Sequence, residues 1–270
     1  ASSSTGVSGN VVVQTGDSNG GTAGSISLQV GNSNHVAGGV VQITAGTSLA
    51  DTPGAVGGAV ALSGGHSAAT DGGVGGGLSI TGGNSLSETN GVGGDVRVQG
   101  GLSASGDGGS VYVSSGSSGS ASSGDVEIAT DTAAATGSSG DVRILTGGSA
   151  AGGAGSITLA TGQSSEDASG DISLSVGSSV GGTAGRVDIV AGEMSGSNLN
   201  GGVVSVAGGS SVDTDSAGPG GDVIVTGGRS GTANSLSSGR GGNVEIVGGG
   251  STTGVGGDVL LRSGVGDTSN

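Results

Sequence analysis

The chain has 270 residues, of which 69 are glycine, and it contains no Cys, Trp or Phe and a single Tyr. This composition excludes a globular core built around aromatic side chains, and it excludes disulfide bonds and thiolate metal sites. The formal net charge of −15 argues against nucleic acids and anionic membrane surfaces as partners, and the absence of a run of about eighteen apolar residues predicts no membrane-spanning helix.

A repeated pattern runs through the chain and begins each time at a glycine. We count sixteen repeats, most of them 15 residues long, and number the positions of each repeat from this first glycine. The repeats begin at Gly9, Gly24, Gly39, Gly58, Gly76, Gly94, Gly109, Gly124, Gly140, Gly155, Gly170, Gly185, Gly202, Gly221, Gly242 and Gly257. Such self-similarity is typical of a repeat architecture, in which each repeat contacts only its neighbours. A disordered Gly/Ser linker has no reason to keep this pattern in step.

Aliphatic residues occupy positions 3 and 5 of every repeat, as Val142 and Ile144 do in the repeat that begins at Gly140. Positions 2, 4 and 6 are mostly polar or small, and position 7 is always small or β-branched. Alternation with a period of two predicts a half-buried strand. Glycine at position 1 and, in fifteen repeats, at position 8 brackets this strand, and serine fills position 10 in thirteen repeats.

These features predict an all-β fold, a narrow parallel β-solenoid of about sixteen coils with mostly 15 residues per coil. Its Gly-bracketed strands would stack about 4.8 Å apart, with ladders of Val, Ile and Leu on one inner wall and Ser, Ala and Gly opposite. We expect one continuous domain over residues 1–270.

Extra residues in the pattern fall in two clusters, which predict longer return loops at 47–93 and 193–241. Both prolines, Pro53 and Pro219, lie in these insertions, where no ladder hydrogen bond is needed from them. Because the two clusters stand nine repeats apart, they suggest a second-order repeat.

Motifs for phosphate and calcium binding do not fit the pattern. A Walker loop needs a lysine after its glycines, and the chain has no lysine. Residues 218–223 are similar to the calcium-binding nonapeptide of β-roll proteins, but here Asp222 directly precedes the aliphatic residue and the period is fifteen. The segment is therefore interpreted as structural.

The acidic residues and histidines are the candidate metal ligands of this chain. Aspartate fills position 2 in six repeats, at Asp95, Asp125, Asp141, Asp171, Asp222 and Asp258. Only Asp125 and Asp141 belong to neighbouring repeats, so a solvated face fits better than a metal site. His35 and His66 lie in return segments with no third ligand type near them, and we expect both to face solvent.

Enzymatic and ice-binding functions find little support in the sequence. The acid pairs Glu166–Asp167 and Asp213–Asp215 could serve glycoside hydrolysis, but sugar subsites usually need stacking aromatic rings, which are absent. The outward positions 4 and 6 are too mixed for a regular threonine array. We therefore predict no enzyme, no catalytic, cofactor-binding or metal-binding residue, and no cofactor.

The expected partner is the chain itself. The 32 ladder aliphatics bury too little surface to offset the ordering of so many residues, which indicates that neighbouring chains contribute. Apolar residues also occupy the outward positions 2, 4 and 6, where they suit lateral packing. These residues include Val12, Val40, Leu145, Val190, Val203, Ile224, Val247 and Leu260.

The pattern Gly-[Asp/Ser]-[Val/Ile]-x-[Val/Ile/Leu]-x-[Thr/Ser]-Gly-x-Ser resembles the Gly/Ser-rich β-solenoid repeat proteins of extracellular fibres and surface appendages. The resemblance is one of composition and covers nearly the whole chain. It implies a secreted or cell-surface structural protein whose subunits assemble into a fibre or filament by end-to-end or lateral packing. O-linked or associated polysaccharide stays open as a further partner. The alternative is an adhesin-like, ice-binding or cation-binding module that uses the inserted loops or a flat face.

Overall fold

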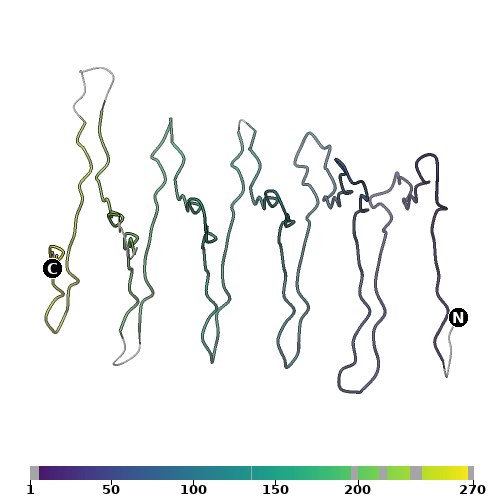
Figure 1. Ribbon diagram of the computed structural model, residues 1–270, viewed down its shortest axis with the longest axis horizontal. Coiled ribbons are helices and arrows are strands. Elements are labelled where there is room, and N and C mark those ends of the chain that lie inside the picture. The colour runs from purple at the N-terminus through teal and green to yellow at the C-terminus, as the bar shows by residue number, and fades with distance from the viewer. Residues whose placement is uncertain (1–5, 135, 196–199, 213–217, 232–238, 267–270) are drawn as a thin grey trace. The chain divides into compact units, whose positions relative to one another are not determined.

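The computed structural model describes residues 6–134, 136–195, 200–212, 218–231 and 239–266. Within these ranges there is no helix and no strand, and Figure 1 accordingly shows a trace without coiled ribbons or arrows. Contacts divide the chain into two units, Ala1–Val142 and Arg143–Asn270. The prediction of an all-β fold, with a parallel β-solenoid of stacked coils, is therefore wrong.

The alternating pattern does not produce a solenoid because alternation alone does not make a strand. Alternation determines which side chains share a face, but a strand also needs a neighbouring segment that pairs with its backbone N–H and C=O groups. In the described part of the chain no such ladder forms between repeats. The backbone hydrogen bonds that link one repeat to the next lie instead between glycines at the ends of the repeats.

The aliphatic columns are not buried, which is a second departure from the prediction. Val142 is 52% exposed and Ile144 is 66% exposed, and no residue in the described ranges is fully buried. The wall expected to cover them consists of Ser, Ala and Gly, which offer little apolar surface. One chain therefore leaves its aliphatic residues open to solvent.

Exposure nevertheless follows position within the repeat. The aliphatic side chains at position 3 are 46–60% exposed, with the single exception of Val11, whereas those at position 5 are 62–80% exposed. Nine described residues are half-buried, and seven of them occupy position 7. These seven are Ala45, Gly64, Gly82, Gly100, Ala191, Gly227 and Gly248. The best-covered part of a repeat is thus its end, next to the following repeat.

Turn chemistry explains the longest loops of the first unit. The amide of Ala55 donates to the carbonyl of Thr52 at 3.2 Å, which closes a turn with Pro53 and Gly54 at its centre. Gly54 has φ 84°, which suits the third residue of a turn with proline at the second. The other positive-φ residues among those described, Gly72 and Asn90, lie in the next two long loops.

Candidate functional site

The recurring local structure of this chain is the junction, which we define as the residues from position 8 of one repeat to position 1 of the next. In nine of the fifteen junctions the position-1 amide donates a hydrogen bond to the position-8 carbonyl, at 2.8–3.0 Å. The donor–acceptor pairs are Gly58–Gly46, Gly76–Gly65, Gly94–Gly83, Gly109–Gly101, Gly124–Gly116, Gly202–Gly192, Gly221–Gly209, Gly242–Gly228 and Gly257–Gly249. We call these closed junctions and the other six open junctions.

Closure does not depend on the length of the loop. Gly101 and Gly109 are eight residues apart in sequence, whereas Gly228 and Gly242 are fourteen apart, and both pairs form the same hydrogen bond. The extra residues of the inserted loops are therefore accommodated beyond the bond, and the ends of adjacent repeats keep one geometry.

The residue at position 7 separates the two classes of junction. All nine closed junctions follow Gly, Ala or Ser at position 7, and all six open junctions follow Thr or Val. The residues that precede open junctions are Thr15, Val30, Thr130, Thr146, Thr161 and Val176. A β-branched residue at position 7 thus accompanies the absence of the junction hydrogen bond in all six cases, one of which has Asp131 in place of glycine at position 8.

The geometry around position 7 gives the reason. At Gly64 an added Cβ would overlap the carbonyl oxygen of Gly76, so this closed junction has no room for a side chain at position 7, whereas the junctions after Ala45, Ser115 and Ala191 close with a Cβ present. Where position 7 carries a side chain, that side chain lies near position 1 of the next repeat, both in closed junctions such as that of Ala191 and in several open ones. A Cβ built on Gly155 would lie 3.5 Å from Thr146 Cγ2, and one built on Gly185 would lie 2.9 Å from Val176 Cγ1. The contact at Gly155 is an ordinary van der Waals distance, whereas at Gly185 the close approach of Val176 favours glycine.

Serine at position 10 forms the turn inside the junction. Among the described residues, its Oγ accepts a hydrogen bond from the backbone N–H two or three residues later in ten repeats. The distance is 2.9 Å from the amide of Gly152 to Ser149 and 2.8 Å from Gly254 to Ser251. A hydroxyl that replaces a backbone acceptor in this way is a common turn device.

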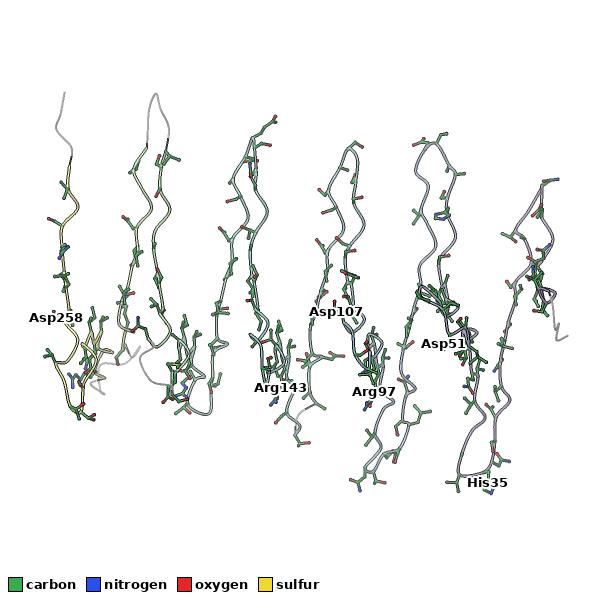
Figure 2. The ribbon with its side chains drawn as sticks, turned by 90° about the horizontal axis from the view of Figure 1, so that it is seen from below. His35, Asp51, Arg97, Asp107, Arg143 and Asp258 are labelled. Carbon is green, nitrogen blue, oxygen red and sulfur yellow. The ribbon has the colours of Figure 1, made fainter. Side chains whose placement is uncertain are left out.

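The predicted histidine and acid candidates do not come together. His35 and Asp51 lie on separate loops (Figure 2), and the amide of His35 donates to Ser33 Oγ at 3.0 Å. The six position-2 aspartates are all exposed. Asp95 and Arg97 form an ion pair at 3.2 Å on exposed side chains, a type of pair that contributes little to stability.

The acid pairs also have structural roles where they are described. Asp167 Oδ1 accepts the amide of Ala168 at 2.8 Å, which places this carboxylate in a loop turn. Asp213 and Asp215 lie outside the described residues. Within the described ranges there is no group of three metal-ligating side chains, no pocket, and no helix able to cross a membrane.

Sequence reasoning missed the junction. The sequence does contain a signal, since position 7 holds only small or β-branched residues. The division of these residues into Gly, Ala or Ser and Thr or Val gains a structural meaning only once the junction hydrogen bond is known. Comparisons with known proteins give no further guide, since no family model, curated protein or solved structure matches this chain.

Proposed function

We propose that this protein is a structural subunit that assembles with copies of itself into an extracellular fibre. The observation that carries the proposal is the exposed surface of the single chain, 26099 Å². A folded monomer of 24.2 kDa exposes about 10,000 Å², and its unfolded chain about 35,000 Å². The single chain therefore buries only a minor part of the surface that a stable protein of this size buries on folding.

The missing burial is larger than a simple dimer provides. The excess over a folded monomer is roughly 16,000 Å², whereas a standard protein–protein interface buries about 1,600 Å² in total. Several neighbours are needed to cover such a surface. This requirement favours a polymer over a discrete pair of chains.

Two features support a copy of the same chain as the neighbour. The aliphatic residues at positions 3 and 5 recur once per repeat, so a partner with the same spacing can contact all of them in step. In the described part of the chain the segments between junctions form no strand ladder, and a neighbouring chain can supply acceptors and donors for their backbone groups. Pairing between chains would then replace the pairing within the chain that the solenoid required.

The extracellular location and any O-linked or associated polysaccharide are supported by the compositional resemblance alone. Serine is abundant and mostly exposed among the described residues, both within the repeats and in the junctions, so hydroxyl groups are available along the chain.

The test is the state of the purified full chain over a range of concentrations. We expect sedimentation velocity to show large species above a threshold concentration, and negative-stain electron microscopy to show filaments in the same samples. A chain that sediments as a monomer throughout would refute the proposal.

A further inference from the structure

The closed junction between repeats 14 and 15 differs from the other eight in its charge. It has the longest loop of the nine, and this loop contains Arg229 and Arg240, which we call the junction arginines, and no acidic residue. Six of the other closed junctions carry Asp or Glu in their loops, and no other junction carries an arginine. These acidic residues are Asp51, Asp71, Glu88, Asp107, Glu193, Asp213 and Asp215. The usual charge of a long loop is therefore reversed at this one place.

The contacts that close this junction place the two arginines opposite each other. The amide of Gly242 donates to the carbonyl of Gly228 at 2.9 Å, and a Cβ built on Gly239 would overlap the hydroxyl of Ser230. The backbone that enters the loop and the backbone that leaves it thus lie side by side and run in opposite directions. The junction arginines are enclosed between these two contacts, one on each side, and both are exposed.

Two like charges at opposing positions of adjacent segments repel each other. Arginines elsewhere in the chain are paired with an aspartate two positions away, as Arg97 is with Asp95 at 3.2 Å and Arg186 with Asp188 at 2.8 Å. Within the part of the chain that the structure describes, the junction arginines form no ion pair. An anion placed between them would turn this repulsion into attraction.

We infer that Arg229 and Arg240 form a binding site for a compact oxyanion with two negative charges, of the sulfate and phosphate class. Each guanidinium group offers N–H donors in a planar fork that matches such oxygens, and a dianion neutralises both positive charges. Exposed glycines stand on both sides of Arg240, at Gly239 and Gly241, so no neighbouring side chain on that segment blocks the ligand. The site needs one chain only and does not depend on the proposed function.

The charge of the rest of the chain limits the size of the ligand. The chain has a formal charge of −15, so a long polyanion that extended beyond the two arginines would be repelled. A small ion interacts mainly with charges within a Debye length, about 8–10 Å at moderate salt. The ligand is therefore a free sulfate or phosphate ion, or a terminal ester of one.

Titration of the full chain with sodium sulfate, followed by NMR, tests the site. Ionic strength is held constant with sodium chloride, and the chain is kept below the threshold concentration for assembly. We expect the backbone amide signals of Arg229, Arg240 and Gly241 to shift along one saturating curve. Arg229→Gln or Arg240→Gln should weaken binding about tenfold, and the double variant R229Q/R240Q should show no saturation. Arg262→Gln, which removes an arginine within a repeat, is the matched control and should bind like the parent.

Two further titrations separate geometry from charge and identify the source of the ligand. The variant R229K/R240K keeps both charges without the planar forks, and we expect it to bind sulfate more weakly than the parent but more tightly than R229Q/R240Q. Saturation by both inorganic phosphate and glucose 6-phosphate would show that free ions and terminal esters fit the site. Saturation by inorganic phosphate alone would restrict the ligand to a free ion.

Three outcomes would overturn the inference. Shifts that rise linearly without saturation, or equal binding by the parent and R229Q/R240Q, would indicate an adventitious ion only. If sulfate does not bind and R229Q/R240Q instead raises the critical concentration for assembly, the arginines contact carboxylates of a neighbouring chain. The anion site then fails while the proposed function stands.

Discussion

The amide of Gly109 donates to the carbonyl of Gly101 at 2.8 Å, and it does so across a loop whose ends are brought together with no side chain between them. Gly100, just before the acceptor, permits this approach, because a Cβ there would overlap the carbonyl oxygen of Gly109. At this boundary the closed geometry depends on glycine at residue 100, because the approach leaves no room for a Cβ there.

Opening a closed junction should require only one substitution. In Gly100→Thr we expect the hydrogen bond from Gly109 to Gly101 to be lost, because the threonine side chain takes the space that the closed geometry needs. Scalar coupling across the hydrogen bond, measured by NMR, and faster exchange of the Gly109 amide would report the loss. Gln99→Thr, one position earlier, should leave both unchanged. Persistence of the coupling in Gly100→Thr would contradict the steric account.

The turn at position 10 should depend on the serine hydroxyl. Ser149→Ala removes the acceptor for the Gly152 amide, and a hydrogen bond of this kind contributes about 0.5–1.5 kcal/mol. We therefore expect the Gly152 amide to exchange up to about tenfold faster. Ser149→Thr should retain the slower exchange, since threonine keeps the hydroxyl, and Ser156→Ala, outside the turn, serves as the matched control. Equal exchange in Ser149→Ala and the parent would refute the assignment.

The two faces of a repeat should differ in their contribution to assembly. Val111, at position 3, is 52% exposed, whereas its neighbour Tyr112 is 91% exposed. If the position-3 column is the face that neighbouring chains cover, Val111→Ser should raise the critical concentration by about tenfold, and Tyr112→Ser should change it little. Sedimentation of matched samples measures both. A larger effect from Tyr112→Ser would place the contact on the opposite face.

Net charge should oppose assembly. Copies of a chain with a formal charge of −15 repel each other, and salt screens this repulsion. We expect the threshold concentration for fibres to fall as sodium chloride is raised from about 10 mM to 150 mM. Magnesium chloride at equal ionic strength should have a similar effect. A much stronger effect of magnesium at micromolar concentration would instead reveal a specific cation site.

The sequence alone determined the repeat and its internal order. The amino-acid sequence by itself shows the sixteen starting glycines, the aliphatic residues at positions 3 and 5, and the two clusters of extra residues. The pattern predicted burial at positions 3 and 5, which the structure leaves exposed, and the least exposed residues lie mostly at position 7. Periodicity reaches this far because it reports which side chains share a face.

Only the tertiary structure determined which segments the faces and ends of a repeat contact. Period-two alternation is the same whether the neighbouring segment belongs to the same coil, to the next coil or to another chain, so it could not distinguish a solenoid from an open framework. The hydrogen bond at the junction, and its dependence on Gly, Ala or Ser against Thr or Val at position 7, follows from distances of a few ångströms between residues such as Gly100 and Gly109. Those distances depend on steric contacts between residues eight or more positions apart, which no local pattern specifies.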